Sequence, residues 1–85
     1  MMNLETATKI VDTMKSENRF PSTTRGIIAV ASLAFQNTGV VTVDVMTDAG
    51  YEVRVNRIGQ IGKVQADGSC AVGPADQKSV AMWSN

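Results

Sequence analysis

The chain has 85 residues, of which 44% are apolar and 19% are charged. Eight basic and eight acidic residues cancel, so the whole chain lacks the positive charge that draws a protein to nucleic acid or to an anionic membrane. The sequence contains no highly charged tail and no low-complexity tract, a composition that is typical of a folded globular protein. We therefore expect residues 1–85 to form one small domain.

Two residue types that enzymes often need are scarce, since the sequence has no histidine and only one cysteine, Cys70. Without histidine the chain lacks the usual general base and the usual activator of a serine or cysteine nucleophile. A single thiol can neither close an internal disulfide nor build a thiolate metal site. The sequence predicts a protein that is not an enzyme, with no catalytic residues, no metal and no cofactor.

The N-terminus shows no basic region followed by an apolar run and a small-residue cleavage site, which is the pattern of a secretory leader. The longest apolar run, residues 26–35, is about half the length that is needed to cross a bilayer. We therefore expect a cytoplasmic protein that does not contact a membrane.

Residues 4–17 predict an amphipathic helix that follows Asn3 as its N-cap. The side of this helix that faces away from its apolar residues carries two pairs of unlike charge at helical spacing, Glu5 with Lys9 and Asp12 with Lys15. Such pairs contribute a few tenths of a kcal/mol each, so this side is expected to face solvent. The apolar stripe consists of Leu4, Ala7, Ile10, Val11 and Met14.

Residues 22–37 predict a second helix, which Ser22 caps after the break at Pro21 and which stops at Gly39. A buried strand is the rival assignment for residues 26–30, but the alanine content favours helix. The large apolar side chains sweep an arc of roughly 220° and leave only a narrow polar stripe. The arc consists of Ile27, Ile28, Val30, Leu33 and Phe35.

Residues 40–56 alternate apolar and polar side chains on both sides of a tight turn and therefore predict a β-hairpin. A three-residue loop at residues 48–50, with Gly50 in the left-handed conformation, keeps the two faces separate. One face then pairs Val43 with Val55, Val45 with Val53, and Thr47 with Tyr51. The other face pairs Thr42 with Asn56, Asp44 with Arg54, and Met46 with Glu52.

The pattern weakens after the hairpin. We expect residues 57–65 to continue as a strand bent at Gly59 and Gly62, followed by a tight turn at Asp67-Gly68 and a third strand at residues 69–72. From Pro74 onward the chain forms either a short helix or a tail. The predicted fold class is α+β, with two N-terminal helices, a three-stranded antiparallel meander and a short C-terminal helix or tail.

The second helix is too apolar for the elements that are expected to cover it. The valine face of the hairpin would pack on its small residues Ala31 and Ala34, with the first helix along one flank. The other flank then needs a partner protein or, most simply, a second copy in a two-fold dimer. The expected dimer interface consists of Ile28, Val30, Leu33 and Phe35.

These features favour a small protein-binding module, an adaptor, assembly factor or inhibitor of the size that is common among microbial and phage accessory proteins. Its partner would be another protein. The expected contacts are the charged residues of the hairpin's polar face and two types that anchor protein interfaces near the C-terminus. They are Asp44, Glu52, Arg54, Met82 and Trp83.

Nucleic-acid binding is the alternative, through a local basic patch of Arg54, Arg57 and Lys63. Residues 57–63 contain a G-x-x-G spacing between two basic residues, as KH modules do, but a KH loop joins two helices and that context is missing here. A third class, catalysis or small-ligand binding, would require a dry pocket with converging polar groups.

Overall fold

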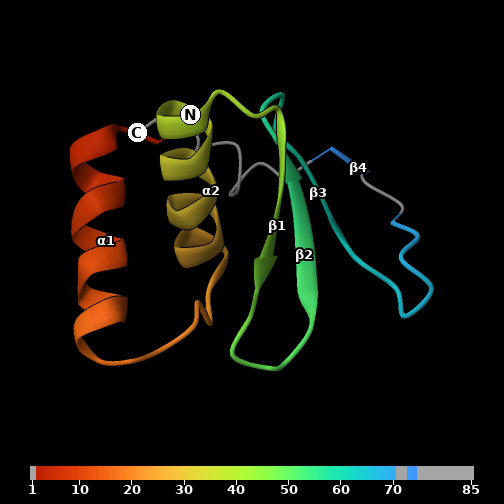
Figure 1. Ribbon diagram of the computed structural model, residues 1–85, viewed down its shortest axis with the longest axis horizontal. Coiled ribbons are helices and arrows are strands. Elements are labelled where there is room, and N and C mark those ends of the chain that lie inside the picture. Colours follow the sequence, from red (N-terminus) through yellow and green to blue (C-terminus); the bar gives the residue numbers. More distant parts are fainter. Residues whose placement is uncertain (1, 71–72, 75–85) are drawn as a thin grey trace.

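The computed structural model describes residues 2–70 and 73–74 of the chain. Its strands form one antiparallel sheet in the order β1-β2-β3-β4. This arrangement confirms the predicted α+β class, in which two helices precede an antiparallel meander (Figure 1). The elements are α1 (Leu4–Ser16), α2 (Thr24–Thr38), β1 (Thr42–Met46), β2 (Glu52–Asn56), β3 (Gln60–Lys63) and β4 (Gly73–Pro74).

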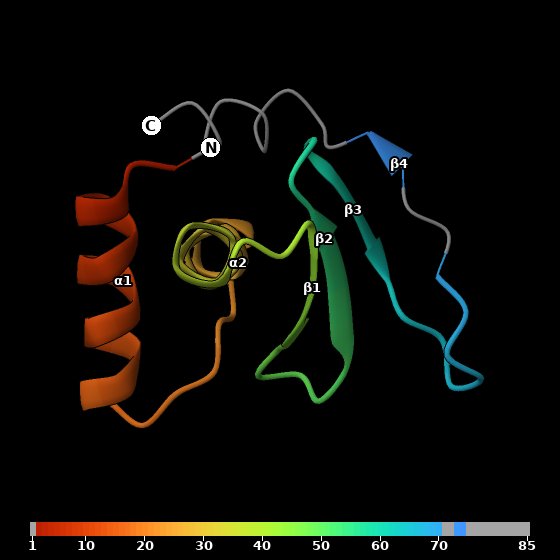
Figure 2. The same cartoon turned by 45° about the horizontal axis from the view of Figure 1, so that its top comes forward.

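The elements form three layers, with α2 between α1 and the sheet (Figure 2). Helix α2 contacts α1 on one side and strands β1 and β2 on the other, whereas α1 packs on α2 and not on the strands. The first helix therefore lies on the side of α2 opposite the sheet, whereas the sequence predicted it along one flank of the second helix. The opposite face of the sheet carries no helix among the described residues.

Helix α1 begins as predicted, because the Asn3 side chain accepts hydrogen bonds from the backbone N–H groups of Glu5 and Thr6 at 2.8 and 3.3 Å. The predicted ion pair of Glu5 with Lys9 forms at 3.5 Å. In the described part of the chain, neither Asp12 nor Lys15 has an ion pair, so the second predicted pair does not form.

The N-cap of helix α2 lies one residue later than predicted, at Thr23 and not at Ser22. The Thr23 hydroxyl accepts a hydrogen bond from the Gly26 N–H at 3.1 Å, which is the reach of a capping side chain. The helix ends at Gly39 in the left-handed conformation, as expected. Neither described helix is long and apolar enough to cross a membrane.

The hairpin has the predicted register at every pair of β1 and β2. Gly50 has φ +88°, and the Thr47 N–H donates to the Tyr51 carbonyl at 2.9 Å, so the three-residue loop is confirmed. The valine side chains Val45, Val53 and Val55 are buried beneath α2. The alternation of the sequence therefore fixes which face of the sheet packs on the helices.

The prediction for residues 57–72 was wrong in two places. The chain does not continue as a bent strand but turns back at residues 57–59, where Gly59 has φ +92° and its N–H donates to the Asn56 carbonyl at 3.1 Å. The third strand is consequently β3 and not residues 69–72. Of that segment, Cys70 forms only an isolated bridge with Val64, and residues 71–72 lie outside the described residues.

The predicted turn at Asp67-Gly68 is confirmed, because the Asp67 carboxylate accepts hydrogen bonds from the Ser69 N–H at 3.0 Å and from its hydroxyl at 2.6 Å. Gly73 and Pro74, where a helix or a tail was expected to begin, pair with Ile61 and Gln60 of β3. The rest of that prediction, together with Met82 and Trp83, lies outside the described residues.

The core lies on both sides of α2. Ile28 is fully buried and Phe35 keeps only 1% of its surface exposed, both within a single copy of the chain. Because Ile28 and Phe35 are buried within one chain, they have no surface to offer a second copy. Of the predicted dimer interface, only Val30 and Leu33, which are half-buried, could contact one. Dimerisation stays a prediction, but the need for it is smaller because α1 and the sheet cover α2 from opposite sides.

Candidate functional site

Strand β1 is the outer strand of the sheet, and one of its edges is free of any other strand within residues 2–70 and 73–74. The bonds from the Thr47 N–H to the Tyr51 carbonyl and from the Arg57 N–H to the Val41 carbonyl show that the odd-numbered residues of β1 bond to β2. The N–H and C=O groups of the even-numbered residues Thr42, Asp44 and Met46 therefore point away from the sheet. No described segment pairs with them, and such an edge is a template for another strand.

The end of this edge already shows such pairing within the chain. The Asp48 N–H, the next even-numbered group, donates to the Pro21 carbonyl in the α1–α2 connection at 3.0 Å. For one residue, the connection thus occupies the place of a neighbouring strand. The free edge ends at Met46, beside this connection.

An apolar groove of about 280 Å³ runs beside the free edge, between β1, α2 and the C-terminal half of α1. Its apolar lining includes Val11, Met14, Phe20 and Val30. Phe20 keeps 61% of its surface exposed and also borders a second hollow of about 280 Å³ between the helices. A large exposed aromatic side chain between two hollows is a feature of protein-binding surfaces.

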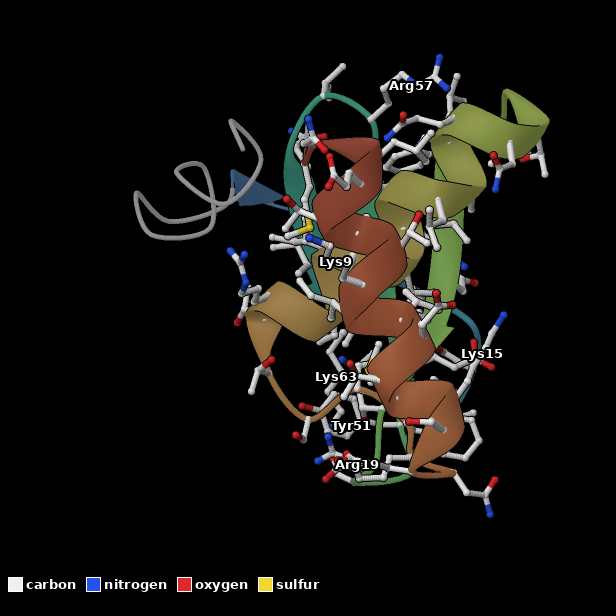
Figure 3. All side chains as sticks on the ribbon, turned by 90° about the vertical axis from the view of Figure 1, so that its left-hand side faces the viewer. Lys9, Lys15, Arg19, Tyr51, Arg57 and Lys63 are labelled. Carbon is white, nitrogen blue, oxygen red and sulfur yellow. The ribbon has the colours of Figure 1, made fainter. Side chains whose placement is uncertain are left out.

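The charged side chains of the groove are Lys15, Arg19 and Asp44. Arg19 forms an ion pair with Glu17 in which both side chains are more than half exposed, whereas Lys15 has no ion pair in the described part of the chain. Figure 3 shows Lys15 and Arg19 toward the same end of the molecule. The groove thus has a positively charged rim.

The negative charge of Asp44 is compensated within the sheet. Arg54, its cross-strand partner, donates two hydrogen bonds to the carboxylate, from Nε at 2.8 Å and from an Nη at 3.1 Å. The hydrogen bond from Arg54 holds the pKa of Asp44 below its ordinary value of 3.8. The structure thus brings together Asp44 and Arg54, two of the predicted partner-binding residues, as a bidentate pair.

This pair predicts a small loss of stability in acid. Because the folded-state pKa of Asp44 is lowered, the pair stabilises the fold above about pH 4 and this contribution disappears as the pH falls through the lowered pKa. Each side chain is 34% exposed, so we expect Asp44→Asn to cost less than about 1 kcal/mol at pH 7. Thermal unfolding of both proteins at pH 7 and pH 2 should show a difference at pH 7 that shrinks at pH 2. An equal difference at both pH values would contradict the assigned pairing.

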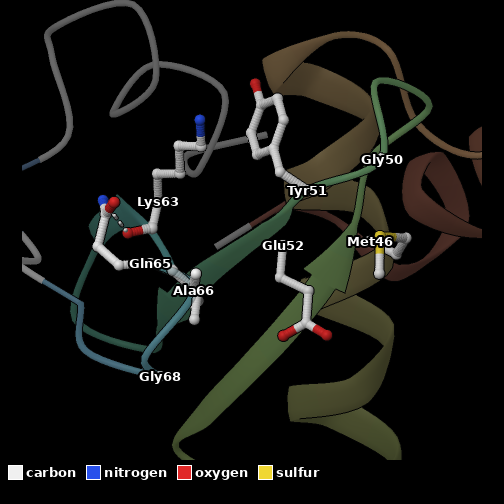
Figure 4. Close-up of a pocket in the computed structure, with 9 residues that line it drawn as sticks. Met46, Gly50, Tyr51, Glu52, Lys63, Gln65, Ala66 and Gly68 are labelled. Carbon is white, nitrogen blue, oxygen red and sulfur yellow. Dashed lines mark hydrogen bonds between the residues drawn. The ribbon is translucent and has the colours of Figure 1, made fainter.

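Glu52, the third charged residue of the predicted surface, lies on the same face and borders an open hollow of about 630 Å³. In this hollow the Lys63 ammonium lies 4.6 Å from the centre of the Tyr51 ring, a cation–π contact. Figure 4 shows Tyr51 and Lys63 directed together and Glu52 directed away from them. The polar groups do not converge, so the hollow does not have the form of a small-ligand site.

The three residues of the predicted basic patch do not lie together. Arg54 binds Asp44 on one face of the sheet, whereas Lys63 projects from the other face because it lies opposite Val53. Arg57 lies at the far end of the molecule from Lys63 (Figure 3). Its guanidinium donates to the Phe35 carbonyl and lies 5.6 Å from the centre of the Phe35 ring. Each cation therefore has a contact within the chain, and the geometry does not favour the nucleic-acid alternative.

Sequence reasoning missed Lys15, Arg19 and Phe20 as site residues. The signal for Phe20 was an aromatic residue before Pro21, in a connection with few other apolar residues; the two cations give no local signal. Within residues 2–70 and 73–74, no group of histidine, cysteine and carboxylate side chains could hold a metal ion. Comparison of the chain with models of protein families, with curated proteins and with solved structures gives no match.

Proposed function

We propose that the chain is a small, non-enzymatic protein-binding module of the cytoplasm, an adaptor, assembly factor or inhibitor of the microbial or phage accessory type. It binds an extended segment of another protein as an additional strand along β1. The observation that supports this proposal is the row of unpaired main-chain groups at Thr42, Asp44 and Met46 beside an apolar groove. In strand addition, main-chain hydrogen bonds provide affinity and pockets for alternate side chains provide specificity.

The two faces of an added strand would meet two surfaces of different chemistry. Side chains on its helix side would enter the groove beside Phe20 and Val30. Side chains on its other side would lie next to the outer row of β1, at Asp44 and its partner Arg54. The predicted polar surface and the groove are therefore two sides of one binding site.

A second copy of the chain is a less suitable occupant of the same edge. In a two-fold pairing of β1 with itself centred on Asp44, the two Asp44 carboxylates would lie directly opposite each other. Like charges opposite each other destabilise a sheet. A two-fold dimer would need a shifted register that places Asp44 opposite Thr42 or Met46, so we propose a different protein as the principal partner.

The site can be tested without knowing the natural partner. Short random peptides displayed on phage are selected on the immobilised chain, and the tightest peptide is synthesised. Its binding should protect the backbone amides of Thr42, Asp44 and Met46 from hydrogen exchange. The amides of Val43 and Val45, which already bond to β2, should change little and serve as internal controls. Protection elsewhere, with none on these three amides, would show that β1 is not the binding edge.

Removal of the exposed aromatic ring should weaken this binding without unfolding the chain. We expect Phe20→Ala to lower the affinity of the selected peptide roughly tenfold or more, because the groove loses its largest apolar contact. The matched control is Ile58→Ala, since Ile58 is 81% exposed, lies in the turn between β2 and β3 and does not line the groove. Titration calorimetry measures both affinities. Equal loss in the two variants would remove Phe20 from the site.

A further inference from the structure

On the basis of the proposed strand addition, the geometry points to an acidic partner segment. We infer that the partner carries a large apolar side chain that enters the groove, and a carboxylate two positions before it that binds Lys15 and Arg19. This chemistry follows from two features, the charge of the groove and the spacing of its cations relative to the apolar lining.

The groove favours a negative side chain because its positive charges are available and its negative charge is not. Asp44 is bound by two of the three guanidinium nitrogens of Arg54, whereas Lys15 has no ion pair among the residues that the structure describes. The pair of Arg19 with Glu17 is exposed, and such pairs contribute only about 0–1 kcal/mol, so an incoming carboxylate can replace it. A lysine or arginine of the partner would instead meet two like charges.

The order of the two partner residues follows from the direction of the elements. Helix α1 and strand β1 end at the same end of the molecule, because the connection after α1 reaches the end of β1 through the bond from the Asp48 N–H to the Pro21 carbonyl (Figure 1). Lys15 lies one helical turn beyond Val11 toward that end, a rise of about 6 Å. Residues on the same side of a strand are about 6.8 Å apart, so positions two residues apart match this spacing.

An added strand that runs antiparallel to β1 forms the more stable pairing. Such a strand enters at the Met46 end, passes Lys15 and Arg19 first and reaches Val11 and Val30 afterwards. The carboxylate therefore precedes the apolar residue. The main-chain groups of β1 restrict the occupant to a polypeptide, since only a strand can match their spacing.

The experiment compares peptide selection on the natural chain with selection on the variant Lys15→Glu/Arg19→Glu. We expect peptides from the natural chain to be enriched in aspartate or glutamate two positions before their groove residue. We expect peptides from the variant to carry lysine or arginine there. The acidic peptide should lose roughly tenfold or more in affinity for the variant, and replacing its carboxylate by lysine should restore binding. The neutral variant Lys15→Met/Arg19→Gln, which has no like-charge cluster, should show no preference for either sign.

Lys9→Glu is the matched control, since Lys9 lies on the same helix, is paired with Glu5 and does not line the groove. It should leave the affinity for the acidic peptide unchanged, within roughly twofold. If selected peptides protect the β1 amides but show no acidic enrichment, or bind the charge-reversed variant equally well, this inference is wrong and strand addition stands. If no selected peptide protects those amides, the proposed function itself is wrong.

Discussion

Phe35→Ala should lower the free energy of unfolding by about 3–5 kcal/mol, the usual cost of removing a buried phenylalanine side chain. Phe35 lies in the core next to the valine face of the sheet, with 1% of its surface exposed. The substitution also removes the ring that the Arg57 guanidinium covers. A chain of 85 residues has roughly 4–13 kcal/mol of total stability. The variant should therefore lose about a quarter of its stability or more, which urea unfolding followed by circular dichroism measures.

The control for this prediction is Phe20→Ala, the same substitution at a side chain that is 61% exposed. We expect it to lower the stability by less than about 1 kcal/mol, because little apolar surface leaves a packed environment. Phe35 is also one of the residues that were predicted from the sequence to lie at a dimer interface, whereas it is buried within the single chain. A similar loss of stability in both variants would contradict the position of the core between α2 and the sheet.

The elements that the sequence predicts well are those that local chemistry determines. The hairpin register follows from Gly50 in a three-residue loop and from strict alternation on both sides, so no information from distant residues is required. The start of α1 follows likewise from one side chain, since Asn3 satisfies the first N–H groups of the helix. At α2, Ser22 and Thr23 are adjacent capping residues, and sequence does not decide between them.

The turn between β2 and β3 was missed because one of its central residues is not typical of turns. Ile58 is an apolar residue at its tip and is 81% exposed, where polar residues are usual. The turn is held by the side chain of Asn56, whose Oδ1 accepts from the Gln60 N–H at 3.0 Å and whose Nδ2 donates to Gln60 Oε1 at 2.9 Å. Gly59, interpreted as a kink, is the left-handed residue of this turn. Because the chain turns at residues 57–59, the third strand is β3 and not residues 69–72.

The candidate site was predicted only where it depends on strand register. Asp44 and Arg54 face each other because the register requires it, and their bidentate pair confirms this pairing, while their role in binding a partner stays a prediction. The groove depends instead on how α1 lies relative to β1, two elements that do not contact each other directly. That position is set by α2, which carries apolar residues on both of its sides. No local pattern in residues 15–20 shows that they will border a strand that begins more than 20 residues later.

The expectation of an obligate second copy has the same origin. It assumed that α1 and the sheet cover neighbouring sides of α2, which would leave a third side open. Because α1 lies behind α2 instead, the two layers cover opposite sides and bury both Ile28 and Phe35. Stacking of this kind buries most of a broad apolar arc within one chain. Val30 of α2 lines the groove at β1 and Leu33 stays half-buried, so dimerisation through these two residues stays a prediction.

Met46→Pro should abolish binding of the selected peptide and leave the fold intact. The N–H of Met46 points away from β2, so proline at this position removes no hydrogen bond of the sheet. The ring replaces the N–H that a partner strand would use and occupies the position of that strand. We expect the affinity to fall roughly tenfold or more, equivalent to about 1.4 kcal/mol or more, while the free energy of unfolding changes by less than about 1 kcal/mol. Titration calorimetry and urea unfolding measure the two quantities.

Val45→Pro, one residue earlier, is the decisive comparison. Val45 is an odd-numbered residue whose N–H bonds to β2 and whose side chain is buried, so the same ring breaks a sheet hydrogen bond and leaves a cavity. We expect a loss of about 3 kcal/mol or more in stability. Two adjacent prolines with different effects on stability are expected when alternate main-chain groups of β1 face the solvent and the buried side chain belongs to Val45. If Met46→Pro destabilised the fold as much as Val45→Pro does, the assignment of the odd-numbered residues of β1 to the hydrogen bonds with β2 would be wrong. Unchanged peptide affinity in a folded Met46→Pro variant would show that the partner does not bind as a strand.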